Sequence, residues 1–193
     1  VIATALSAFL FTNKKLISEY LEDIFKENNI KSTQYLRDDI VYYNESEPDP
    51  LKLRAEKEAG EVKRDKADTF YLSMTLALRD KRIDMDQIRE ILKEALPNVD
   101  FLRLLSLKFT GDATYFQFDN NLFVQVRRSG TDAKMRGYAC GPSKKDCVFY
   151  LDKLLHYTGE RSKLYEKTVP LEYQDNIYSL SQKIYKEYLY NGL

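Results

Sequence analysis

The segment from residue 124 to 138, VQVRRSGTDAKMRGY, gathers several side chains that can bind an anion. Both of its ends alternate apolar and polar residues, as strands do, and the Ser-Gly-Thr-Asp stretch between them predicts a tight turn. A phosphate dianion needs several charge-assisted donors at once, and this corner offers guanidinium, ammonium, hydroxyl and backbone donors. The residue types therefore make the corner a candidate phosphate site.

Strand geometry predicts which of these donors converge. The stretch LFVQVR places its leucine and valines on one face, so Arg127 leaves the strand on the other, less apolar face. Gly130 permits the positive φ that lets successive backbone N–H groups turn toward one anion. We expect Asp132 to be the only built-in counter-ion. The candidate phosphate ligands are Arg127, Ser129, Gly130, Thr131, Lys134 and Arg136.

A surface hairpin with merely solvated cations explains the same spacing equally well, because Ser-Gly-Thr turns are common. Other residues offer weaker candidates for chemistry. His156 has no serine or cysteine nucleophile identifiable beside it, so we expect it to pack at the surface. The pair Asp84 and Asp86 is better explained as the start of a helix than as a metal site.

The composition describes an ordinary soluble globular protein. The chain has 193 residues, 44% of them hydrophobic, with 30 basic against 30 acidic side chains, so any basic site must be local. Aromatic residues are spread along the chain without a basic stripe, which argues against a nucleic-acid partner. The opening VIATALSAFLF is too short to span a bilayer, so we expect no membrane partner. Cys140 and Cys147 lack the spacing of a disulfide framework or a zinc site, as in a cytoplasmic protein.

Hydrophobic periodicity predicts α/β organisation in the first half of the chain. We expect a buried strand over residues 1–11, a helix after Asn13, and a strand near residues 40–43. The charged run 52–66 predicts a solvated helix face or loop, and two helices follow over 67–78 and 84–95. Asp84 and Gln87 can form a capping box for the second of these helices, and Pro97 closes it.

The second half predicts an antiparallel sheet. Four short strands between residues 98 and 139 are joined by tight turns, and Ser143 with Asp146 opens a helix toward Gly159. A last helix is expected from about Tyr173 to Tyr190. We therefore divide this α+β chain into an α/β segment, 1–97, and a strand-rich segment, 98–193. Because the chain begins inside an apolar stretch without methionine, we expect it to be part of a longer protein.

The corner resembles the phosphate-binding loop of the α-D-phosphohexomutases, the phosphoglucomutase and phosphomannomutase superfamily, whose pattern is Arg-Pro-Ser-Gly-Thr-Glu-Pro-Lys-hydrophobic-Arg-x-Tyr. The match holds at the six candidate ligands and at Tyr138. Arg128 replaces a proline of the pattern, so we expect its side chain to point to solvent. Upstream, VKRDKADTFY resembles the family's Val-Arg-Asp-Lys-Asp-Gly stretch, which assigns Arg64, Asp65 and Lys66 to the same context.

The resemblance implies a fold and a function. Residues 98–193 would be the fourth, TATA-binding-protein-like domain of a phosphohexomutase, an antiparallel sheet with covering helices, and 1–97 part of its α/β third domain. The corner would hold the non-reacting phosphate of a hexose phosphate while an isomerase of this type transfers phosphate within the sugar. The phosphoserine and magnesium motifs are missing, so catalysis would need the remaining domains of the full-length mutase. Gly60 and Glu61 are at best a remnant of the family's sugar-selecting loop.

An alternative is a noncatalytic phospholigand-binding or regulatory module that keeps the phosphate loop without the chemistry. A plain interaction domain with an unused hairpin is a third possibility, and it predicts no phosphate affinity. The three differ in whether hexose phosphates bind and whether they are turned over.

Overall fold

A computed structural model of the chain describes residues 2–28 and 34–174. The chain forms two compact units, Val1–Thr33 and Gln34–Leu193, so the division falls at Thr33 and not near Pro97. The expected boundary fails because the strand just before the long helix joins the same sheet as the strands after Pro97. Most of the expected last helix, 173–190, lies outside the described residues.

The described residues of the first unit form two helices, α1 (Ile2–Thr12) and α2 (Ile17–Glu27). The expected buried strand over residues 1–11 is wrong. A short apolar run does not distinguish a strand from a helix by periodicity, and this run is rich in the helix formers alanine and leucine. Nor is this apolar stretch uniformly buried, since Phe11 is 88% exposed. The helix expected after Asn13 is confirmed as α2. Asn13 itself caps the end of α1, by donating to Phe9 O, and does not open α2.

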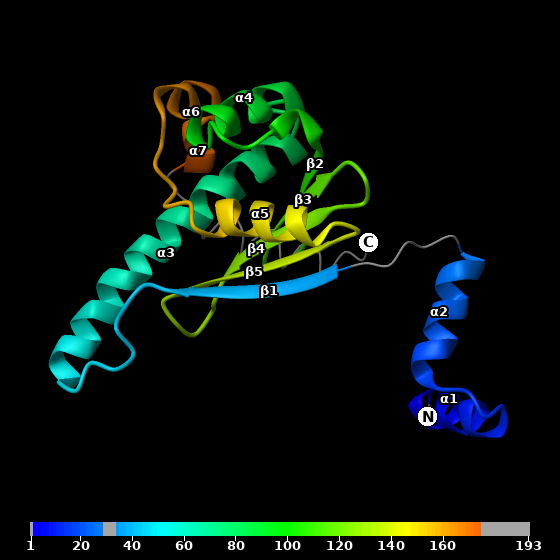
Figure 1. The fold of residues 1–193 in the computed structure, drawn as a ribbon. Helices are drawn as coiled ribbons and strands as arrows, with labels where there is room; N and C mark the ends of the chain where they lie inside the picture. Colours follow the sequence, from blue (N-terminus) through cyan, green and yellow to red (C-terminus); the bar gives the residue numbers. More distant parts are fainter. Residues whose placement is uncertain (1, 29–33, 175–193) are drawn as a thin grey trace. The chain divides into compact units, whose positions relative to one another are not determined.

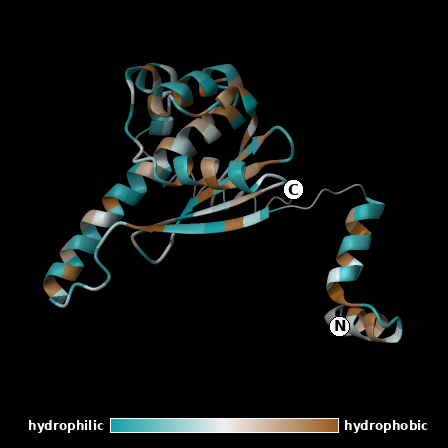
Figure 2. Cartoon of the chain, viewed as in Figure 1, coloured by the Kyte–Doolittle hydropathy of each residue, from teal (hydrophilic) through white to brown (hydrophobic). Residues whose placement is uncertain are grey.

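Within the described residues of the second unit, five strands form one antiparallel sheet (Figure 1). The strands are β1 (Gln34–Val41), β2 (Leu104–Phe109), β3 (Thr114–Phe118), β4 (Phe123–Arg128) and β5 (Lys134–Gly141). Their order is β1-β5-β4-β3-β2, and a single 3-10 turn, Phe101–Arg103, precedes β2. The α+β class and the antiparallel sheet are confirmed. The order also makes β1, mostly hydrophilic in Figure 2, an edge strand beside β5.

One face of this sheet packs against helices. A Cβ on Gly137 of β5 would lie 2.5 Å from Leu151 Cδ1, so α5 (Lys144–Leu155) approaches the strand closely. On the same face, Phe116 of β3 contacts Tyr71 of the long helix with ring centroids 5.2 Å apart. We call the opposite side the open face, because the helices that pack on the sheet within residues 34–174 lie on the Gly137 side. Alternation places on it Arg37 and Asp39, Tyr115 and Gln117, Phe123, Gln125 and Arg127, and Lys134, Arg136 and Tyr138.

The long helix α3 (Pro50–Arg79) covers both the charged run 52–66 and the helix expected over residues 67–78. Asp49 caps it by accepting from the amides of Leu51 and Lys52, and the proline at its first position suits a helix start. The charged run 52–66 is its amino-terminal half, and its carboxyl-terminal half is buried from Phe70 to Ala77. This resolves the alternative of a solvated helix or a loop in favour of the helix.

Gly60 lies in the interior of α3, not in a sugar-selecting loop. A Cβ there would stand 2.9 Å from Tyr42 O and 3.1 Å from the Ala133 side chain. The helix therefore packs directly on Tyr42, which follows β1, and on Ala133, which precedes β5. A glycine at position 60 permits that approach.

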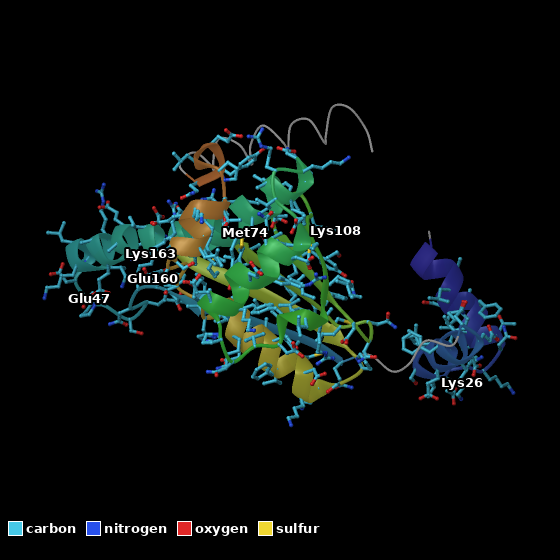
Figure 3. The ribbon with its side chains drawn as sticks, turned by 90° about the horizontal axis from the view of Figure 1, so that it is seen from above. Lys26, Glu47, Met74, Lys108, Glu160 and Lys163 are labelled. Atoms are coloured by element: carbon cyan, nitrogen blue, oxygen red, sulfur yellow. The ribbon has the colours of Figure 1, made fainter. Side chains whose placement is uncertain are left out.

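The remaining helices close the core. The capping box of Asp84 and Gln87 on α4 (Met85–Ala95) is confirmed, as is the Ser143 cap of α5. The short helices α6 (Lys163–Thr168) and α7 (Leu171–Gln174) follow. Met74 lies among the helices in Figure 3, fully buried, whereas Lys108 and Lys163 are at the periphery. In the parts of the chain that the structure describes, no helix is long and apolar enough to cross a membrane.

Candidate anion-binding site at the β4–β5 corner

Arg127 and Arg136 are direct partners in the antiparallel register of β4 and β5. Both side chains lie on the open face, and like charges directly opposite each other destabilise a sheet. Each arginine is offset by a carboxylate on its outer side. Arg127 Nη1 is 2.9 Å from Asp112 Oδ2, and Arg136 Nε is 3.5 Å from Asp39 Oδ2. We call these four residues, Asp39, Arg136, Arg127 and Asp112, the charge row.

The two ends of the charge row differ. The Asp112 side chain is 60% exposed, so its pair with Arg127 is a surface ion pair worth about 0–1 kcal/mol. Asp39 also accepts a hydrogen bond from Arg37, at 3.0 Å. Arg136 Nε is buried and makes no hydrogen bond with the described residues, since its contact with Asp39 is near enough for attraction but is not aligned. A buried donor without an acceptor costs about 1–3 kcal/mol, so Arg136 Nε is an unsatisfied group within the charge row.

The turn that joins the two strands is closed by its own backbone. The Ser129 amide donates to Lys134 O at 2.8 Å, and the Lys134 amide donates to Asp132 O at 2.8 Å. The amides of Gly130 and Thr131 at the exposed tip have no hydrogen-bond partner in the described chain. The expected positive φ at Gly130 is wrong, and a Cβ there would meet nothing within 4 Å. The turn therefore offers two unbonded amides without needing the left-handed conformation.

A buried arginine from α3 stabilises this turn by donating hydrogen bonds to its carbonyl oxygens. Arg64 Nη1 donates to Asp132 O at 2.7 Å and to Ser129 O at 3.2 Å, and its Nε donates to Asp65 at 2.8 Å. The Arg64 side chain is only 8% exposed. Sequence reasoning placed Arg64 in the family context but did not predict this contact, because the partners are far apart in the chain.

Arg128 points to the helix-covered face instead of to solvent, so that expectation is wrong. Its Nη1 lies 3.0 Å from Asp65 and its Nε 3.9 Å from Asp68. Strand alternation explains the direction, since Arg128 follows Val124 and Val126 on the buried side. Burial raises the pKa of Asp68 to about 7, against the lowering effect of Arg128.

Asp132 and Lys134 form a separate network at the base of the turn. Asp132 accepts from Tyr43 Oη at 2.9 Å and lies 3.2 Å from both Lys57 and Lys134. Although partial burial opposes it, hydrogen bonds from Tyr43 and the two lysines lower the pKa of Asp132 to about 2. Lys134 also contacts Glu45 at 2.6 Å, and its pKa is raised by these hydrogen bonds. Lys134 is thus held by two carboxylates and acts as a support for the turn.

These contacts correct the expectation that Asp132 is the only counter-ion. Carboxylates from β1, from the turn before β3, from α3 and from the β1–α3 loop pair with the corner's cations, namely Asp39, Asp112, Asp65 and Glu45. Sequence reasoning missed them because the sheet brings them together from distant segments. An anion must therefore compete with carboxylates, most easily with the exposed Asp112.

The metal candidates Asp84 and Asp86, and the catalytic candidate His156, have other roles. Asp84 caps α4, and Asp86 pairs with Arg89 at 2.5 Å. His156 lies at the end of α5 near Asp152. Over residues 2–28 and 34–174, no group of three or more His, Cys, Asp or Glu side chains could hold a metal ion.

Of the six predicted ligands, the structure brings Arg127 and Arg136 together on the open face and leaves Gly130 and Thr131 exposed at the tip. Ser129 is buried, at 4% exposure, and Lys134 is already paired. No protein-family model matches the chain, and a search of curated proteins finds no relative.

Proposed function

We propose that this chain is the C-terminal part of a phosphoglucomutase- or phosphomannomutase-type enzyme, and that the β4–β5 corner holds the non-reacting phosphate of a hexose phosphate. The observation that carries the proposal is the direct opposition of Arg127 and Arg136 on the open face. A dianion between two guanidinium groups turns their mutual repulsion into attraction for a shared partner.

Binding proceeds by exchange of partners at the exposed end of the charge row. The phosphate displaces Asp112 from Arg127, which is inexpensive because surface ion pairs are weak. The unbonded amides of Gly130 and Thr131 and the Thr131 hydroxyl supply further donors at the tip. Arg64 and Lys134 position the turn and do not themselves touch the ligand in this proposal.

The task of the corner is orientation. Binding of the remote phosphate holds the sugar in place for the reaction. Such positioning of the substrate contributes much of the rate enhancement of phosphoryl-transfer enzymes. The magnesium that the resemblance implies does not fit the side chains described here, so no step in this chain is assigned to it. The phosphoserine and the metal would belong to the remaining domains of a cytoplasmic mutase.

A calorimetric titration with glucose 1-phosphate at low ionic strength tests the proposal. Each charge-assisted hydrogen bond is worth about 1.5–3 kcal/mol, so Arg127→Ala should weaken binding about ten- to a hundredfold. Lys93→Ala is the matched control, because Lys93 is an exposed cation of α4, outside the sheet that carries the corner. Equal losses for both variants would mean diffuse electrostatics and would contradict a formed site.

The same protein sample tests whether this chain binds the ligand without catalysing the reaction. We expect glucose 1-phosphate to bind without turnover, because the sequence lacks the family's phosphoserine motif and the described residues hold no group that could bind a metal ion. Mutase activity in this chain alone would show that the chemistry resides here and not in further domains.

A further inference from the structure

The open face continues from Arg127 along β4 with a different chemistry. Gln125 lies two residues before Arg127 on the same side of the strand, about 7 Å away. Its Nε2 donates to Thr110 Oγ1 at 3.2 Å, which holds the amide plane at the surface. Tyr115 is the cross-strand partner of Gln125, and its ring stacks on Phe123 with centroids 5.1 Å apart.

This combination suits a sugar ring. A planar amide offers donors and acceptors in a fixed arrangement, as sugar hydroxyls require, and an aromatic face attracts the positive C–H edge of a ring. Gln125 Oε1 has no hydrogen-bond partner in the described chain, so it can accept from a hydroxyl. The spacing from Arg127 to Gln125 matches the reach from a phosphate to the hexose ring that carries it.

Asp112 connects the two halves of the surface. It pairs with Arg127 at 2.9 Å and belongs to the same short turn as Thr110. When a phosphate takes its place on Arg127, the Asp112 carboxylate is released from its ion pair and is exposed in the turn whose Thr110 holds Gln125. A carboxylate accepts hydrogen bonds through both oxygens, so it can bind two sugar hydroxyls.

We propose that Gln125, Tyr115 and Asp112 form a sugar subsite on the open face, which seats the hexose ring of the ligand whose phosphate lies between Arg127 and Arg136. This inference rests on the proposed function, since it needs the phosphate at the corner. It assigns sugar contact to the sheet, although the segment that resembles a sugar-selecting loop lies inside α3.

The opposite direction across the sheet fits a sugar less well. Beside Arg136, Arg37 and Asp39 bond to each other at 3.0 Å. Tyr35 and Tyr138 are tilted by 31° with centroids 6.3 Å apart, and they offer no amide. Tyr35 lies on the edge strand β1, separated from Gln125 by β5, and therefore serves as the control position.

The test compares inorganic phosphate with glucose 1-phosphate on the same variants of the full chain. Gln125→Leu should leave the affinity for inorganic phosphate within about twofold and weaken glucose 1-phosphate about fivefold, the value of one hydrogen bond. Tyr35→Leu should change neither affinity by more than about twofold. NMR should also show the Gln125 side-chain NH₂ resonances shifting with glucose 1-phosphate but not with phosphate, a readout that needs no variant.

The outcomes separate the two proposals. If inorganic phosphate does not bind the wild-type chain, the corner site fails and the sugar subsite fails with it. If phosphate binds but Gln125→Leu treats both ligands alike, only the sugar subsite is overturned. A selective loss of glucose 1-phosphate in Tyr35→Leu would also overturn it, by placing the sugar on the β1 side.

Discussion

Arg127 of β4 and Arg136 of β5 stand directly opposite each other on the open face, and each is held by a carboxylate from a different side, Asp112 or Asp39. The row is electrically neutral, so without a ligand it is a ladder of ion pairs. The least stabilised groups of the row are the exposed Asp112 and the Arg136 Nε, which makes no hydrogen bond with the described residues. Under the proposed function, the same residues support the sheet and exchange Asp112 for a dianion.

Arg64→Ala should destabilise the second unit by about 2–4 kcal/mol, because it removes charge-assisted hydrogen bonds to two turn carbonyls and leaves Asp65 partly unpaired. Urea unfolding measures the loss. Lys63→Ala, at the exposed neighbouring position of α3, is the control and should change stability by less than about 0.5 kcal/mol. Similar values for both variants would show that Arg64 does not support the turn.

Gly60→Ala should destabilise the protein by about 1–3 kcal/mol, although glycine to alanine normally stabilises a helix interior by about 1 kcal/mol. The reversal follows from the approach of Tyr42 O to 2.9 Å of the new methyl group. Thermal or urea unfolding gives the sign directly. A stabilised variant would mean that α3 does not pack on the entry and exit of the sheet as described.

Asp68 should make stability depend on pH. Burial raises its pKa to about 7, above the unfolded value, so the native state keeps a proton that the unfolded chain releases. The unfolding free energy then falls as pH rises from about 4 to 7, by up to about 1.4 kcal/mol per pH unit.

The comparison of wild type with Asp68→Asn isolates this effect. Between pH 5 and pH 7, the wild type should lose about 2 kcal/mol more stability than the variant. If the two pH profiles are parallel, Asp68 does not titrate in this range.

The sequence predicts much of the second unit because its local signals are strong. The strands of the sheet end at tight turns, and α4 and α5 carry the expected caps at Asp84 and Ser143. The first apolar run is wrongly predicted as a strand because its length and composition allow either structure. The position of β1 beside β5 depends on pairing between residues about a hundred positions apart, which no local pattern encodes.

The candidate site is predicted in composition but not in organisation. Alternation along β4 correctly separates Arg127 from the buried face, and the same rule applied one residue later would have turned Arg128 inward. The cross-strand opposition of Arg127 and Arg136 requires the register of β4 and β5. The pairing of the corner's cations, and the support from Arg64, come from segments that meet only in the folded chain.

A double-mutant cycle on Arg127 and Arg136 tests the central claim most directly. Unfolding free energies of the wild type, Arg127→Ala, Arg136→Ala and the double variant would be measured in saturating phosphate and in chloride of the same ionic strength. In chloride, we expect a repulsive coupling of a few tenths of a kcal/mol, as for like charges on neighbouring strands. In phosphate, the coupling should become attractive by about 1 kcal/mol or more, because both guanidinium groups then share one dianion. A coupling of the same sign and size in both salts would contradict the account.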